Sequence, residues 1–175
     1  MNIYLTGFMG SGKSTTGRKI ASSLRWTFID TDKLVEEQNA LTVAELFSTH
    51  GEQYFREAET KALQTVSARS RTVVACGGGT PCSAENISIM KKTGVIVYLR
   101  LPVATLVSRL EKSKTARPLL QGKGDTDLTT RVQGLLTQRA EWYEQADLIV
   151  DTLNTTVEEL ISRLADLIRS KGAYL

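Results

Sequence analysis

The segment "GFMGSGKS" (residues 7–14) has the spacing G-x-x-x-x-G-K-S, a pattern whose residue types are suited to holding phosphate groups. It follows the short apolar run "NIYLT" and precedes a helical pattern, which is the strand and helix context that this motif requires. The alternative, a glycine turn that matches by chance, would not need this context. Its glycines allow backbone N–H groups to curl around phosphates, and the helix N-terminus adds positive potential. We therefore predict a nucleotide phosphate site, a P-loop, that includes Gly10, Ser11, Gly12, Lys13, Ser14 and Thr15.

The P-loop alone does not distinguish a switch GTPase, an ATP-driven machine and a small-molecule kinase. The guanine-reading tetrapeptide N-K-x-D is absent from the sequence. Two acids, Asp30 and Asp32, follow the second apolar run, so they should project from the carboxyl end of a strand, where ligands bind in open α/β sheets. Asp30 could hold the water shell of a metal ion, and Asp32 could accept a proton or a hydrogen bond from a substrate hydroxyl. The alternative is that Asp32 caps the helix that follows it.

Three arginines stand in positions that suggest anion binding. Arg139 lies within an apolar helical stripe, where a guanidinium needs an anion unless it extends out to solvent. Arg56 stands three residues before Glu59, a spacing that would orient the guanidinium or form only a surface ion pair. Arg117 lies in a charged segment with two glycines. If this segment closes as a lid, Arg117 would lie over the γ-phosphate; the alternative is a basic loop exposed to solvent.

A second glycine-rich turn, with Gly77, Gly78 and Gly79 in succession, follows the third apolar run. Three residues without side chains would let a ring approach the backbone closely at the carboxyl end of a strand. The alternative is a tight turn that needs positive φ, which would require one or two glycines rather than three. The turn is therefore predicted to serve the molecule that accepts the phosphoryl group.

These residues must be positioned by alternating strands and helices. Apolar runs predict strands over 2–6, 27–30, 72–76, 95–101 and 147–152. Helical patterns cover 13–24, 32–38, 42–50, 52–68, 83–92, 102–112 and 128–145, and a last helix opens at Thr156. Thr42 with Glu45, and Thr156 with Glu159, have the spacing of capping boxes. Five strands alternating with helices imply an α/β fold, with a parallel sheet covered by helices on both faces.

Composition sets limits on the class of protein. The chain has 175 residues, which suits one domain, and 41% hydrophobic and 23% charged residues, as in ordinary globular proteins. A net charge of +3 is too small to argue for a nucleic-acid partner, and the longest apolar stretches are too short to cross a membrane. Cys76 and Cys82 fit no metal or redox motif and are interpreted as reduced residues of a cytosolic protein. We expect no targeting segment, because the P-loop begins at Gly7.

Taken together, the motifs resemble those of the shikimate kinase family, within the nucleoside-monophosphate-kinase-like group of P-loop proteins. The resemblance covers nearly the whole chain and rests on "GFMGSGKST", "FIDTD", "ELFSTHGEQYFREAE", "GGGT", "RPLL" and "QRAEWY", in the family's order. It implies a three-layer α/β/α P-loop fold with a five-stranded parallel sheet and a mobile lid. It also implies Mg²⁺-dependent transfer of the γ-phosphoryl group of ATP to the 3-hydroxyl of shikimate, on the route to chorismate and the aromatic amino acids.

The resemblance also implies a role for each matching residue. The catalytic group would be Lys13, Asp32 and Arg117, with Asp32 as the base that meets the acceptor hydroxyl. The shikimate carboxylate would be held by Arg56 and Arg139, and the ring would lie against Gly77, Gly78 and Gly79, with the N–H of Gly78 or Gly79 in contact. Mg²⁺ would be served by Ser14 and Asp30. The adenine would be flanked by Arg109 and the loop after Asp151, including Asn154.

We therefore expect a single kinase domain over residues 1–175, with acceptor-binding helices at about 32–67 and a lid at about 113–126. The expected partners are ATP and shikimate, without nucleic acid or membrane, in a cytoplasmic monomer. The loop "TLNTT" departs from the family, which often has a basic residue there, so adenine contacts should come from backbone groups, Asn154 or Thr155. Two alternatives are a related kinase, such as a gluconate or adenylate kinase, and a P-loop binding module without catalysis.

Overall fold

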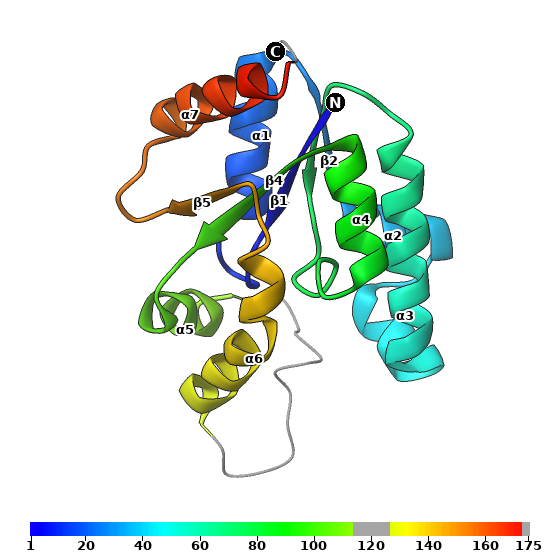
Figure 1. Ribbon diagram of the computed structural model, residues 1–175. Coiled ribbons are helices and arrows are strands. Elements are labelled where there is room, and N and C mark those ends of the chain that lie inside the picture. The colour runs from blue at the N-terminus through cyan, green and yellow to red at the C-terminus, as the bar shows by residue number, and fades with distance from the viewer. Residues whose placement is uncertain (114–126, 173–175) are drawn as a thin grey trace.

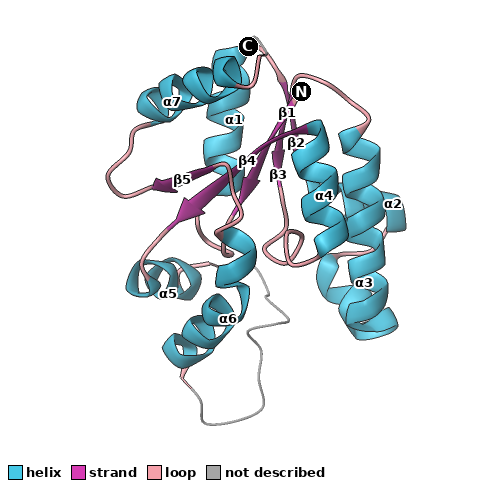
Figure 2. Ribbon diagram, viewed as in Figure 1, coloured by secondary structure: helices cyan, strands magenta, loops and turns pink. Residues whose placement is uncertain are grey.

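A five-stranded sheet lies between two groups of helices in the computed structural model, which describes residues 1–113 and 127–172 (Figures 1 and 2). The strand order is β2-β3-β1-β4-β5, and every pairing is parallel. The strands are β1 (Asn2–Thr6), β2 (Thr27–Asp30), β3 (Thr72–Ala75), β4 (Gly94–Arg100) and β5 (Leu148–Asp151). The helices are α1 (Lys13–Leu24), α2 (Thr31–Asn39), α3 (Val43–Ser67), α4 (Ala84–Thr93), α5 (Val103–Glu111), α6 (Leu128–Tyr143) and α7 (Val157–Ser170). This confirms the predicted fold class.

Successive residues of the strands pack on opposite faces of the sheet. In β1, Ile3 and Leu5 belong to a core cluster with residues of α1 and α7, whereas Tyr4 packs with residues of α3 and α4. The central strands β1 and β3 are buried along their whole length, as expected for parallel strands covered on both faces. The outer strands β2 and β5 are more exposed. Two cores therefore hold the sheet rigidly between its helical layers.

Two further helical groups extend beyond the carboxyl ends of the strands (Figure 1). Helices α5 and α6 pack on each other around a cluster that includes Phe8 and Val132. Helices α2 and α3 pack around a cluster that includes Val35 and Phe55. Because the loops after β1 and β3 end between these groups, the residues predicted to do chemistry come from the same edge of the sheet.

The predicted elements are found with small shifts at their ends. The segments predicted as two helices, 42–50 and 52–68, form one assigned helix, α3, with non-helical backbone at Gly51 (φ 81°, ψ 175°). The two-helix prediction is thus right about the break, which glycine allows because positive φ is strained for other residues. Both predicted capping boxes are present, at the starts of α3 and α7.

Helix α2 begins at Thr31, earlier than predicted, and this changes the interpretation of the acidic pair. The N-cap is Asp30, whose Oδ1 accepts a hydrogen bond from the backbone N–H of Asp32 at 3.2 Å. The alternative that Asp32 caps the helix is therefore wrong. Asp32 instead stands in the first turn of the helix, which Asp30 already caps.

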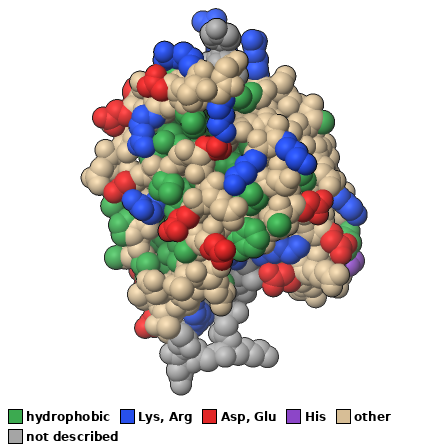
Figure 3. All heavy atoms as spheres, in the orientation of Figure 1, with side chains coloured by type: hydrophobic (Ala, Val, Ile, Leu, Met, Phe, Trp, Pro, Cys, Tyr) green, Lys and Arg blue, Asp and Glu red, His purple; other side chains and the backbone are tan. Residues whose placement is uncertain are grey.

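The surface carries charges of both signs. On the face shown in Figure 3, lysine and arginine side chains are interspersed with acidic ones. Over residues 1–113 and 127–172, no helix combines the length and the apolar character needed to cross a membrane.

Candidate active site

The P-loop leaves the first turn of α1 open to an anion. Gly12, the N-cap of α1, has φ 94° and no side chain with which to cap, and no acidic residue stands in the first turn. The N–H groups of that turn are therefore directed at the space beyond the helix. Lys13 Nζ donates to the carbonyl oxygens of Gly7 and Phe8, both at 2.9 Å, so its ammonium group lies against the same loop. Together these groups are suited to binding phosphate oxygens.

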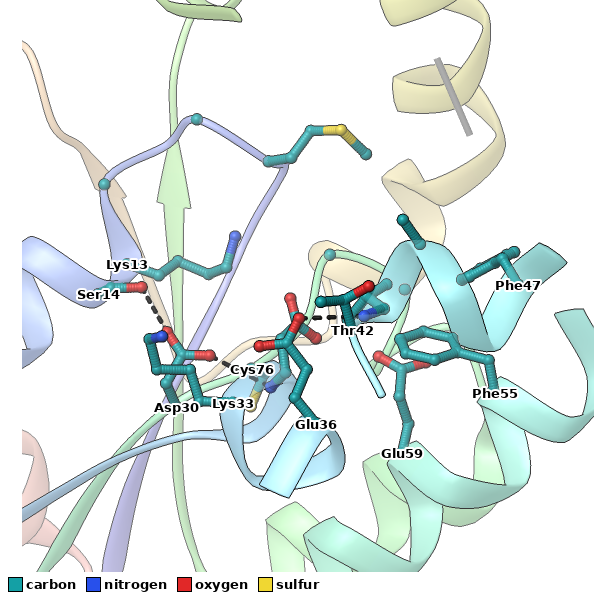
Figure 4. Close-up of a pocket in the computed structure, with 18 of the residues that line it drawn as sticks. Lys13, Ser14, Asp30, Lys33, Glu36, Thr42, Phe47, Phe55, Glu59 and Cys76 are labelled. Atoms are coloured by element: carbon teal, nitrogen blue, oxygen red, sulfur yellow. Dashed lines mark hydrogen bonds between the residues drawn. The ribbon is translucent and has the colours of Figure 1, made fainter. Parts of the chain in front are cut away.

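Ser14 and Asp30 meet beside this site. Ser14 Oγ donates to Asp30 Oδ2 at 2.6 Å (Figure 4). Among the described residues, no group of three or more His, Cys, Asp or Glu side chains could hold a metal ion. Proteins often bind Mg²⁺ through only one or two oxygen ligands when phosphates and water fill its other positions. One hydroxyl and one carboxylate are such a set. The pair therefore fits a Mg²⁺ ion that arrives with a nucleotide.

A cavity of about 790 Å³ joins the P-loop to the end of β3 and to helices α2, α3 and α6. Its charged lining residues are Lys13, Asp30, Asp32, Lys33, Glu36, Arg56, Glu59, Arg109 and Arg139. Phe47 and Phe55, whose ring centroids are 4.7 Å apart, form an apolar wall on α3, across the cavity from Lys13 (Figure 4). The cavity thus has one side suited to phosphate groups and a second side suited to a small charged molecule with an apolar face.

Two carboxylates of α3 orient Arg56. Its guanidinium forms ion pairs with Glu59 and, at 2.9 Å, with Glu52. Glu59 is only 1% exposed, so the pair is not the surface ion pair that the spacing alone allowed. Burial opposes the charge of Arg56, but Glu59 and Glu52 more than offset this and raise its pKa. Arg56 is therefore charged and fixed at the edge of the cavity.

Glu59 also joins α3 to the second glycine turn. Its Oε1 accepts a hydrogen bond from Thr80 Oγ1 at 2.7 Å, and the carbonyl oxygen of Thr80 accepts one from Asn86 Nδ2 at 2.8 Å. Sequence analysis missed Thr80 and Asn86. A signal was available for Asn86, since it stands four residues before Met90 on the buried face of α4, where a polar side chain predicts a buried hydrogen bond.

Arg139 faces inward from α6. It is 7% exposed, so the alternative that it extends out to solvent is wrong. Its guanidinium lies over the ring of Phe8, 5.8 Å from the centroid. Its Nη1 is buried and makes no hydrogen bond to any residue within the described ranges. A buried guanidinium nitrogen without an acceptor is costly, so this geometry is stabilised when an anion occupies the cavity.

The second glycine turn does not have the backbone of a tight left-handed turn. None of the residues 77–79 has a positive φ, so that alternative is wrong. The N–H of Gly77 donates to Thr31 Oγ1 at 2.9 Å, which ties the turn to the start of α2. The N–H groups of Gly78 and Gly79 donate to no acceptor among the described residues.

Close packing explains why side chains are absent from this turn. A Cβ atom on Gly77 would meet carboxylate oxygens of Asp32 and Glu59. A Cβ atom on Gly79 would lie 2.7 Å from Cζ of Arg56, closer than real Cβ contacts. The predicted reason for the three glycines, approach of a ring to the backbone, is thus incomplete, because two of them make room for the protein's own charged groups.

We expect Gly79→Ala to weaken binding of the acceptor by roughly tenfold, the effect of losing one charged hydrogen-bonding group. The new methyl group would displace the guanidinium of Arg56 from its place between Glu52 and Glu59. Titration calorimetry with the acceptor measures this. Gly134→Ala is the matched control, since a Cβ there meets nothing within 4 Å. An equal affinity in the two variants would show that the position of Arg56 is unimportant.

Of the two residues predicted to flank the adenine, Arg109 lines the cavity and Asn154 does not. Arg109 Nη1 donates to the carbonyl oxygen of Gly10 at 3.1 Å, and Arg109 lines the cavity beside the P-loop. Asn154 is not part of the cavity lining, and its Nδ2 instead donates to Asp151 Oδ2 at 3.0 Å. Asp151 also accepts a hydrogen bond from the N–H of Leu153 at 3.1 Å, so its carboxylate organises this loop.

Some of the remaining predicted residues line the cavity and others do not. Ser11 and Gly77 are buried and do not line it, whereas Gly78 and Gly79 do. Arg117 and nearly all of the predicted lid lie outside the described residues.

Both cysteines are free thiols. Cys76 is buried at the end of β3 and lines the cavity. Burial raises the pKa of Cys76 and of Cys82, so both thiols stay protonated and neither is suited to act as a nucleophile.

Comparison with known proteins gives concordant matches. The family model described as shikimate kinase matches residues 9–169. A shikimate kinase of Caldanaerobacter subterraneus subsp. tengcongensis is 42% identical over 159 residues, which covers 91% of each chain. One from Geobacter metallireducens is 36% identical over 170 residues, covering 97% of this chain and 93% of that protein. The solved shikimate kinase from Acinetobacter baumannii in complex with shikimate superposes with a TM-score of 0.86 at 34% identity, covering 97% and 93% of the two chains.

Proposed function

The chain belongs to the shikimate kinase family, and from this premise we propose that it transfers the γ-phosphoryl group of ATP to the 3-hydroxyl of shikimate, giving shikimate 3-phosphate and ADP. It is a kinase of the route to the aromatic amino acids. The observation that carries the acceptor assignment is Arg139, a buried cation of the cavity whose Nη1 has no hydrogen-bond partner among the described residues. A small carboxylate such as shikimate supplies the missing anion.

In the proposed reaction, the open turn of α1 and Lys13 bind the β- and γ-phosphates of ATP. Asp32 lies in the cavity wall, where it meets the acceptor hydroxyl and takes its proton. Arg56 and Arg139 hold the carboxylate of shikimate, and the apolar wall of Phe47 and Phe55 limits the size of the acceptor. These contacts align the hydroxyl with the γ-phosphorus, which is the main task in phosphoryl transfer.

Ser14 and Asp30 would hold Mg²⁺, a group that the hydroxyl and carboxylate oxygens fit. When bound, Mg²⁺ supplies charge neutralisation at the phosphate oxygens. In the structure the two side chains are hydrogen-bonded to each other, which keeps both oxygens beside the P-loop.

We further assign the helical region at about residues 32–67 to acceptor binding, because Asp32, Arg56 and Glu59 come from it. The cavity joins its phosphate side and its acceptor side within one chain, so the proposed reaction needs no second copy, and we propose that the protein acts as a monomer. We assign the protein to the cytoplasm, where ATP is available.

The direct test is ADP production by the purified protein with ATP, Mg²⁺ and shikimate, compared with gluconate, with AMP and with no acceptor. Among these acceptors, we expect ADP production only with shikimate. Turnover with AMP or gluconate instead would favour a related kinase, and no turnover with any acceptor would favour a P-loop binding module. The paired carboxylates and guanidinium groups of the cavity are more than nucleotide binding requires.

We expect the acceptor's carboxylate to be required for tight binding. Leaving a buried ion unpaired costs about 3–5 kcal/mol, and water in the open cavity should reduce this to about 2–3 kcal/mol, or roughly 30- to 150-fold in affinity. Titration calorimetry of shikimate and its methyl ester measures this ratio. Lysine cannot reproduce the two parallel hydrogen bonds of a guanidinium, so Arg139→Lys should reduce the ratio.

The control for this comparison is Arg169→Lys, which changes an arginine that is 65% exposed on α7. It should keep the wild-type preference for the acid. Equal affinity of the wild-type protein for acid and ester would mean that Arg139 and Arg56 do other work, and the acceptor would have to be reassigned.

A further inference from the structure

The carboxyl-terminal end of α6 touches the second glycine turn through Tyr143. Tyr143 is fully buried, and its hydroxyl donates to the carbonyl oxygen of Gly78 at 2.6 Å. Its ring stacks on Tyr98 of β4, with centroids 4.9 Å apart. Figure 1 shows the end of α6 next to the loop that follows β3. The contact joins residues 65 positions apart in the sequence, so it is a product of the tertiary fold.

This hydrogen bond acts on a peptide group of the cavity wall. The carbonyl of Gly78 and the N–H of Gly79 belong to one planar trans peptide and therefore point in opposite directions. Holding the carbonyl oxygen on Tyr143 turns the N–H of Gly79 away from Tyr143. Gly78 and Gly79 line the cavity, whereas Tyr143 does not, so this direction leads to the cavity. The N–H of Gly79 donates to no acceptor among the described residues, which leaves it available to a ligand.

The same helix carries a second group for the ligand. Arg139 stands one helical turn before Tyr143, and its Nη1 would be 3.4 Å from a Cβ atom on Gly78. Because Tyr143 and Arg139 are both on α6, the hydrogen bond of Tyr143 to Gly78 and its ring stack on Tyr98 hold this guanidinium beside the glycine turn. Burial raises the pKa of Tyr143, so its hydroxyl remains a donor throughout the neutral pH range.

We propose that Tyr143 is a positioning residue for the acceptor: its hydroxyl fixes the Gly78–Gly79 peptide so that the N–H faces the cavity, in register with Arg139. The proposal rests on the proposed function, since shikimate is the acceptor with which it is tested. It concerns the acceptor side only. Tyr143 has no contact with the P-loop among the hydrogen bonds and ring contacts of the described residues.

Tyr143→Phe removes the hydroxyl and keeps the ring that stacks on Tyr98. We expect the KM and Kd for shikimate to rise roughly tenfold, because the peptide loses its hydrogen bond and can rotate, while the KM for ATP changes by less than about twofold. Tyr98→Phe is the matched control, since it removes a hydroxyl from the same stacked pair that makes no hydrogen bond to a described residue. It should leave both KM values unchanged. Melting temperatures report on folding of both variants.

An unchanged Kd for shikimate in Tyr143→Phe would overturn the inference, and so would an equal loss of affinity for ATP and shikimate, which is the result of a merely structural role. A wild-type protein inactive on shikimate would overturn the proposed function together with this inference, so the two failures are distinct. If Tyr143→Phe does not fold, the wild-type protein labelled with ¹⁵N-glycine decides. Its 13 glycines make the spectrum tractable. Shikimate should shift the amide resonance of Gly79 and slow its hydrogen exchange, and an unaffected amide would overturn the inference.

Discussion

Replacing Asp32 by Asn is expected to lower kcat by on the order of 10²–10⁴-fold, the usual contribution of a positioned general base, while the affinity for ATP is retained. Asp32 lines the cavity beside the glycine turn, and its carboxylate is not needed as a helix cap because Asp30 performs that role. Asparagine has nearly the same size but cannot take a proton at neutral pH. Phosphoryl transfer needs little proton removal early in the reaction, so part of the loss will come from poorer orientation of the acceptor hydroxyl.

Steady-state kinetics at saturating ATP and shikimate measure this effect, and titration of ATP alone separates binding from turnover. Asp166→Asn is the matched control, because Asp166 is 69% exposed and pairs only with Arg169 on α7 among the described residues. It should be fully active. A normal kcat for Asp32→Asn would remove Asp32 from the catalytic group and reopen the choice of base.

Replacing Lys13 by Ala is expected to lower kcat/KM for ATP by at least about 10²–10³-fold, the effect of losing one preorganised group that stabilises transition-state charge. In the structure, Nζ of Lys13 is held by two carbonyl oxygens of the P-loop. The ammonium group is thus already beside the phosphate site, and little reorganisation is needed when it transfers to the β- and γ-phosphates. Alanine favours the helix, so the variant should remain folded.

The control for Lys13→Ala is Lys19→Ala, on the exposed side of the same helix. Circular dichroism of both variants reports on the fold, and ADP production reports on activity. Near-normal turnover by a folded Lys13→Ala variant would contradict the assignment of the P-loop as the phosphate site.

The sequence by itself was sufficient for features that depend on neighbours within a few residues. The P-loop, the acidic pair after β2 and both capping boxes are read from fixed local spacings, and the strands and helices from local periodicity. The resemblance between motifs also indicated the family, which the comparisons then confirmed. The position of Arg139 within the apolar stripe of α6 was also read locally, but only the structure excluded a guanidinium that extends out to solvent.

The tertiary structure decided which distant residues meet. Glu59 and Thr80 are 21 positions apart and Tyr143 and Gly78 are 65 apart, and no local pattern encodes such contacts. Whether Arg56 belonged to a surface pair or to the cavity depended on how α3 packs, since the spacing to Glu59 is the same in both cases. The three glycines were recognised as a turn, but two of them are required because Asp32, Glu59 and Arg56 converge on that turn. The physical reason is that local signals report backbone propensity, whereas burial and convergence of charges arise only when helices pack around the carboxyl edge of the sheet.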